Sequence, residues 1–156
     1  MRPYEGALRI LRQKGDEKTV TLKAGEKPTG TCDLAVRVRS VQPMPADTLL
    51  LHVQTPRTTR LRFLAGQSVT LSAAAGGTEA QATYAIASCP CDERNLHFHL
   101  ARDDDGPLSA AVFDDRIRAG AAVGVRGPVG DFVLDAQSTR PLVFAACDTG
   151  FAPIRS

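Results

Sequence analysis

The chain has 156 residues, enough for one ordinary domain with a buried core and a short extension. Hydrophobic residues make up 43% of it and charged residues 23%, a composition typical of a globular protein rather than a disordered one. The net charge of +2 gives no electrostatic reason to expect nucleic acid or an anionic membrane as partner. No apolar stretch approaches the roughly 20 residues of a membrane helix, and the N-terminus is polar. We therefore expect a cytoplasmic location.

Residues 1–32 differ from the rest of the chain and form a predicted N-terminal extension. Two short alternating runs, residues 8–11 and 19–23, flank Gly15 and Asp16, which favours a β-hairpin. Residues 27–31 have the composition of a linker. This segment carries too few apolar residues to form a core of its own.

From residue 34 onward, apolar and polar side chains alternate with the period of a β-strand. Glycine and proline interrupt the alternation at intervals of about 8 to 15 residues, which predicts a β-barrel or sandwich. The predicted strands, including the first, cover residues 34–38, 49–53, 60–63, 67–72, 81–87, 96–101, 122–126 and 131–134.

Two later segments do not follow this pattern. In residues 107–118 the apolar side chains fall near helical spacing, with Pro107 suited to the first turn and Gly120 beyond the end. Gly106 or Asp105 is the expected cap of this helix. Residues 141–146 form an unbroken apolar run, which predicts a buried strand leading into an α/β unit.

Five short segments, in chain order, carry a resemblance to a known family. They are residues 63–67 (F-L-A-G-Q), 84–88 (Y-A-I-A-S), 106–109 (G-P-L-S), 127–132 (G-P-V-G-D-F) and 148–153 (D-T-G-F-A-P). Together they resemble motifs of the FAD-binding domain of the ferredoxin-NADP reductase superfamily, in the form found in reductases that accompany oxygenases. The resemblance implies a mainly β fold: a six-stranded antiparallel Greek-key barrel with one capping helix over residues 33–137. Residues 138–156 would be the first strand of a truncated nucleotide-binding domain.

The resemblance also implies a cofactor and a function. The cofactor is FAD, and the chain would pass electrons from NAD(P)H through it to a partner redox protein or oxygenase component. Tyr84 and Ala85 would flank the flavin ring, and Gly106, Leu108 and Ser109 would hold the pyrophosphate. Independently of the family, free backbone N–H groups and a hydroxyl at a helix start suit a phosphate. Thr149 and Gly150 would border the nicotinamide side. No catalytic residue and no metal ligand is expected.

The sequence departs from the family's motifs at three positions. Ala82 replaces the arginine that pairs with the pyrophosphate, Ala85 replaces a serine beside the flavin, and Asp148 replaces a glycine. Losing a charge-assisted hydrogen bond costs roughly 1.5–3 kcal/mol. Acidic residues 103–105 either repel a phosphate by their negative charge or lie in solvent. Arg60, Arg62 or Arg102 could supply the positive charge that Ala82 lacks. The alternative is a flavin-free, non-catalytic binding or assembly module.

Histidines and cysteines raise two further questions. His97 and His99 alternate on a predicted strand, a spacing able to bind a metal, but a solvated polar face is the favoured interpretation. Cys89 and Cys91 are separated by one residue, which matches neither a zinc pair nor a C-x-x-C redox motif. We expect these two, with Cys32 and Cys147, to be reduced and partly buried.

Overall fold

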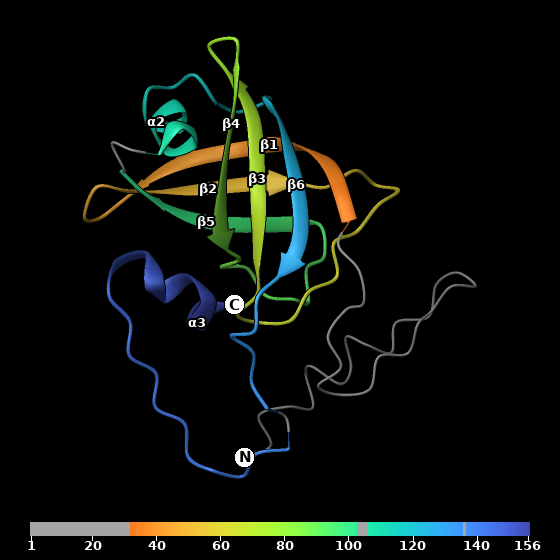
Figure 1. Cartoon of the computed structure of the whole chain (residues 1–156), viewed down its shortest axis with the longest axis vertical. Helices are drawn as coiled ribbons and strands as arrows, with labels where there is room; N and C mark the ends of the chain where they lie inside the picture. Colours follow the sequence, from red (N-terminus) through yellow and green to blue (C-terminus); the bar gives the residue numbers. More distant parts are fainter. Residues whose placement is uncertain (1–31, 103–105, 136) are drawn as a thin grey trace.

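A computed structural model describes residues 32–102, 106–135 and 137–156. This part of the chain is mainly β, and its six antiparallel strands curl into a half-barrel (Figure 1). The predicted six-stranded antiparallel fold is therefore confirmed. The predicted hairpin of residues 8–23 lies outside the described residues. Of the predicted extension, residues 1–32, the structure describes only Cys32, which is the first residue of a strand.

The strands and helices have the following bounds. The strands are β1 (Cys32–Met44), β2 (Thr48–Gln54), β3 (Ser68–Ala75), β4 (Thr78–Ala85), β5 (Asn95–Ala101) and β6 (Ala122–Val129). The helices are α2 (Pro107–Phe113), a 3-10 turn η1 (Asp148–Phe151) and α3 (Ala152–Arg155). Neighbouring strands follow the order β4-β3-β6-β1-β2-β5. The sheet thus begins with β4 and ends with β5, and its curl brings these two strands into contact. No helix in the described ranges is long and apolar enough to cross a bilayer.

The core lies inside the curl and follows the predicted alternation. On β1, Val36 and Val38 are buried while Arg37 and Arg39 are exposed. The largest fully buried side chain is Phe98 of β5, and α2 closes one side of the core by packing against β3 and β4. Fully burying an apolar side chain of this size contributes roughly 1.5–3 kcal/mol, so this interior is the main source of stability.

Three predicted strands are wrong. Residues 60–63 bury Leu61 and Phe63 in the core as the alternation indicated, but they form no ladder with any strand of the described ranges. Residues 131–134 form no ladder with a described strand: the chain bends at Asp131, whose carbonyl accepts from the N–H of Val133 (2.8 Å), and Phe132 is 58% exposed. Residues 141–146 are exposed and do not pair with any strand that the structure describes, and Val143 is 94% exposed. Periodicity reports which face a side chain takes, whereas a strand also needs a hydrogen-bonding neighbour.

Helix α2 is shorter than the predicted span of residues 107–118. It begins at Pro107 after the cap residue Gly106, as expected, but it ends at Phe113. Asp115 has φ 58°, a left-handed conformation that cannot continue a right-handed helix. The apolar spacing nevertheless held beyond the helix, because Ile117 is buried from the following turn.

One glutamine joins three of the sequence motifs. Gln67 is buried, and its Oε1 accepts from the backbone N–H of Leu64 (2.8 Å) while its Nε2 donates to the carbonyl of Gly130 (3.5 Å). Its own carbonyl accepts from the N–H of Ile86 (3.0 Å), just after β4. The side chain therefore joins the loop before β3 to the turn after β6, and the backbone carbonyl of the same residue holds the chain just after β4.

We expect Gln67→Ala to lower the free energy of unfolding by about 1–3 kcal/mol, because it removes a buried side chain and leaves the partly buried N–H of Leu64 without its partner. Urea denaturation followed by circular dichroism measures this. The matched control is Gln81→Ala on the exposed face of β4, for which the change should stay within about 0.5 kcal/mol. Equal effects of the two substitutions would contradict the assigned role of Gln67.

Candidate flavin site

The seam between β4 and β5 is where the curled sheet meets itself. Within the described ranges, each of these strands has a ladder partner on one side only: β4 pairs with β3, and β5 pairs with β2. Among the described residues, a backbone bond from Ala87 N–H to the carbonyl of His97 (2.8 Å) joins the two sides at one end. An edge strand presents unpaired N–H and C=O groups, so this seam offers backbone donors and acceptors to a ligand.

Tyr84 and Ala85 stand at the end of β4, on the border of this seam. Tyr84 is half-buried and packs against the core on the same face of β4 as Ala80 and Ala82. Ala85, the last residue of the strand, is half-buried as well. The position of Ala82 on the face of Tyr84 means that an arginine there would emerge on the same side as the tyrosine ring.

The predicted phosphate residues lie at the start of α2. Gly106 is the cap residue and is partly exposed, whereas the side chains of Leu108 and Ser109 are buried. The hydroxyl of Ser109 donates to the carbonyl of Ala101 at the end of β5 (2.5 Å). Ser109 thus ties α2 to β5, and its hydroxyl is engaged within the protein. What remains for a ligand at this position is backbone.

The C-terminal residues of the chain pack beside the same strand. Thr149 and Gly150 lie in η1, which contacts β5, with Thr149 partly buried and Gly150 exposed. Asp148 opens this turn with φ 52°, a conformation for which glycine is favoured. This backbone requirement explains why a glycine suits the position, and it could not be read from one sequence. Further along, the hydroxyl of Ser156 donates to the carbonyl of Ser88 (3.0 Å).

His97 and His99 lie where the C-terminal residues pack against β5. The favoured interpretation, a solvated polar face, is therefore wrong for His99. His99 is buried, and its Nε2 lies 3.4 Å from Nη1 of Arg155. His97 is half-buried and meets His52 edge to face, with 4.7 Å between ring centroids. Among the described residues, no three histidine, cysteine or acidic side chains gather as metal ligands.

Burial lowers the pKa of both His97 and His99, and the neighbouring Arg155 lowers it further in each case. The repulsion between His97 and His52 acts in the same direction, against a weaker opposing pull from Asp92. The unfolded chain therefore binds more protons than the folded chain once the pH falls below about 6.5. The free energy of unfolding is therefore unaffected by the titration of His97 and His99 above that pH. It decreases as the pH falls through their folded-state pKa values.

We expect the melting temperature to fall between pH 7.5 and pH 5, a window above the ordinary carboxylate range. Arg155→Ala should make this fall shallower, because it removes a positive charge that opposes protonation of His97 and His99. Arg39→Ala, on the exposed face of β1, is the control and should leave the slope unchanged. A steeper fall in the Arg155 variant would contradict this account.

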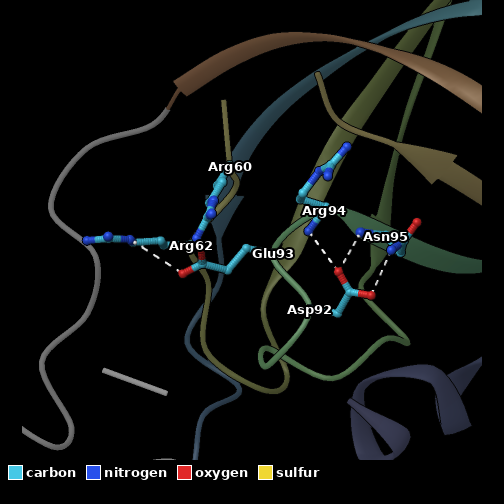
Figure 2. A network of polar contacts seen from close by, with 6 residues as sticks. All are labelled: Arg60, Arg62, Asp92, Glu93, Arg94 and Asn95. Carbon is cyan, nitrogen blue, oxygen red and sulfur yellow. Dashed lines mark hydrogen bonds and ion pairs between the residues drawn. The ribbon is translucent and has the colours of Figure 1, made fainter. Parts of the chain in front are cut away.

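Of the three arginines considered from the sequence, one lies beside α2. Arg60 and Arg62 each form an ion pair with Glu93 (3.5 Å each), as Figure 2 shows. Arg102 follows β5 directly, is exposed, and places its guanidinium 4.5 Å from the ring centroid of Phe113 in α2. A guanidinium over an aromatic face keeps its hydrogen-bond donors at the edge available. The acidic residues 103–105 lie outside the described residues.

The expectation of four reduced cysteines is wrong for two of them. Cys89 and Cys91 form a disulfide in the loop between β4 and β5, and both are exposed. Cys32 and Cys147 are unbonded. Cys32 is partly buried, which raises the pKa of its thiol, and it donates to the carbonyl of Gly127 (3.3 Å).

Comparisons with known proteins agree with this architecture. Residues 35–134 match the profile of the family described as "Oxidoreductase FAD-binding domain". The chain belongs to this family of oxidoreductase FAD-binding domains. Its six-stranded fold and the order of its motifs are those of the ferredoxin-NADP reductase superfamily.

The chain is also similar to individual proteins of known class. It is similar to protein RfbI of Salmonella typhimurium (32% identity, 77% of this chain, 34% of the relative). It is also similar to reductase component 1 of terephthalate 1,2-dioxygenase from a Comamonas species (30% identity, 70% and 31%). Among solved structures, the Amycolatopsis cytochrome P450 reductase GcoB superposes with a TM-score of 0.71 (28% identity, 83% and 38%). The chain thus spans about a third of the length of these proteins.

Proposed function

We propose that this chain is the FAD-binding part of a reductase that passes electrons from NAD(P)H to a partner oxygenase component or redox protein. The family match over residues 35–134 carries the proposal. The partner class follows from the relatives, because one is a reductase component of a dioxygenase and another a cytochrome P450 reductase. When bound, FAD supplies the hydride and electron chemistry, and the protein positions and tunes it. Binding to nucleic acid or membrane is not part of the proposal, and a cytoplasmic location stays a prediction.

The residues around the seam fit FAD in outline. The edges of β4 and β5, which have no ladder partner in the described part of the chain, supply backbone groups for the polar chain of the cofactor. We place the flavin ring against Tyr84 and Ala85, and the pyrophosphate near the backbone of Gly106, Leu108 and Ser109. Thr149 and Gly150 then border the face that a nicotinamide approaches. Residues 138–156 begin a nucleotide-binding unit in this scheme, and the exposed apolar side chains of Leu142, Val143 and Phe144 support it.

Arg102 takes over the charge that Ala82 lacks in this proposal. It is the one of the three arginines considered that lies beside α2, and its guanidinium has no carboxylate among the ion pairs of the described residues. A charged hydrogen bond to phosphate contributes roughly 1.5–3 kcal/mol. Arg102→Ala should therefore weaken FAD binding about 10-fold or more. Arg39→Ala should not change it.

A second candidate is a flavin-free binding or assembly module on the same fold. Two observations favour it: alanine occupies both positions 82 and 85, and the hydroxyl of Ser109 is engaged by Ala101. In this case the seam would serve as a protein contact and the chain would take up no flavin.

FAD titration separates the two candidates. Under the first candidate, binding quenches the fluorescence of FAD. The melting temperature of the protein also rises with FAD concentration, because a ligand bound to the folded state alone stabilises it. Unchanged fluorescence and an unchanged melting temperature at saturating FAD would reject the first candidate in favour of the second.

A further inference from the structure

The disulfide between Cys89 and Cys91 lies outside the residues assigned to FAD. It closes a turn of three residues through Pro90, with 5.1 Å between the two Cα atoms, and both cysteines are exposed. A disulfide stabilises a fold mainly by restricting the unfolded chain, and this effect shrinks with the length of the closed loop. A disulfide across one intervening residue therefore contributes little to the stability of the folded state.

Exposure and weak coupling to the fold are the properties of labile disulfides, as opposed to structural ones. In a reducing compartment, disulfides that do form are usually transient, catalytic or redox-sensing. In the turn of residues 89–91, the disulfide is accessible to solvent and adds little to the free energy of unfolding. We propose that Cys89 and Cys91 form a reversible thiol–disulfide exchange site for low-molecular-weight thiols of the glutathione class.

The surroundings of the turn confine the change to a few residues. On one side, the hydroxyl of Ser88 accepts from the backbone N–H of His97 (3.3 Å) and so ties the chain to β5. On the other side, the carboxylate of Asp92 accepts from the backbone N–H groups of Arg94 (3.1 Å) and Asn95 (3.0 Å), and from the side chain of Asn95 (2.8 Å) (Figure 2). The bond can open and close between these anchors while the half-barrel stays folded.

The hydrogen bonding of the turn also sets the direction of exchange. The backbone N–H of Cys91 donates to Sγ of Cys89 (3.2 Å). A donor to sulfur stabilises its negative charge, so Cys89 is the better leaving thiolate. The incoming thiolate accordingly attacks Sγ of Cys91, the bond between the two cysteines breaks, and Cys89 leaves and takes up a proton.

A second thiol completes the reaction. It attacks the sulfur of the first thiol in the mixed disulfide, releasing the oxidised thiol dimer and leaving Cys91 as a thiol after protonation. In total, two small thiols are oxidised to one disulfide, and the protein disulfide is reduced to two thiols. Two electrons and two protons are transferred, and the reverse sequence closes the bond again.

The test uses the full chain, oxidised and folded, in native buffers with varied ratios of reduced to oxidised glutathione. Samples are quenched with acid, alkylated and weighed as intact protein. We expect alkylatable thiols to rise from two to four as the ratio increases, to fall again when it is reversed, and the circular dichroism to stay constant. Peptide mapping of early samples should find glutathione on Cys91 in preference to Cys89.

Two variants provide controls. Cys32→Ser with Cys147→Ser should go from no alkylatable thiols to two over the same range, and Cys89→Ser with Cys91→Ser should keep two thiols throughout. The proposal is overturned if the disulfide resists glutathione until denaturant is added, or if the thiols do not pair again in oxidised glutathione. Glutathione found chiefly on Cys89 would overturn the assigned direction. Peptide mapping of the unmodified chain decides the matter if a variant fails to fold.

Discussion

Restoring two side chains is expected to tighten FAD binding about 10- to 100-fold. The variant carries Ala82→Arg and Ala85→Ser, which return a cation and a hydroxyl to the end of β4. The gain corresponds to the roughly 1.5–3 kcal/mol of a charge-assisted hydrogen bond, most of it from the arginine. Position 82 is half-buried on the same face as Tyr84, at a strand edge without a ladder partner among the described residues. The long side chain therefore has a path out along the seam.

Isothermal titration calorimetry of the double variant and of each single variant measures this effect. The control is Thr83→Arg, which places the same charge on the opposite, exposed face of β4, where Thr83 meets Thr70 (3.0 Å between hydroxyls). Arginine at position 83 should leave the affinity nearly unchanged. If both arginines improve binding equally, the gain is a general effect of net charge, and Ala82 does not mark the site of the missing contact.

Gly66→Ala is expected to lower the free energy of unfolding by about 3 kcal/mol or more. Gly66 has φ 93°, and a Cβ at this position would overlap the backbone carbonyl oxygen of Phe132. Because the obstacle is backbone, no rotation of a side chain relieves it. The loop before β3 and the turn after β6 would have to separate, which also strains the hydrogen bonds of Gln67.

Gly77→Ala separates the two causes of this effect. Gly77 has a similar φ of 87°, but a Cβ there would meet nothing within 4 Å. The control therefore carries the backbone strain alone, about 1–2 kcal/mol. Urea denaturation of both variants should give a clearly larger loss for Gly66. Equal losses would mean that the approach of Phe132 is not what requires a glycine.

The sequence predicted the barrel strands well because alternation reports burial directly. The prediction failed where burial and strand pairing do not coincide. Leu61 and Phe63 are buried although they lie in a loop, and residues 141–146 are apolar although they are exposed. The short motifs gave the right family because they mark backbone contacts. Gly66 and Phe132 belong to two different motifs, and in the structure they touch.

The site was predicted less completely, since its details depend on contacts between distant residues. Ser109 has the residue type that suits a phosphate, but only the structure shows its hydroxyl engaged by Ala101. His99 alternates like a solvated residue, but α3 covers it through Arg155. The left-handed backbone of Asp148 and the bond between Cys89 and Cys91 have no signature in residue pattern or spacing.

The position of β6 between β3 and β1 has a consequence for biogenesis. During synthesis the chain emerges from its N-terminus, so β1 leaves the ribosome about 90 residues before β6, the second of its two partner strands, as Cys32 and Gly127 illustrate. Until then, β1, β2 and β5 can assemble only as one ribbon and β3 with β4 as another, each with an open flank. Such distant pairings are slow to form, typically milliseconds to seconds. The hydrophobic interior of this domain is therefore sealed by its last strand, after translation of nearly the whole half-barrel.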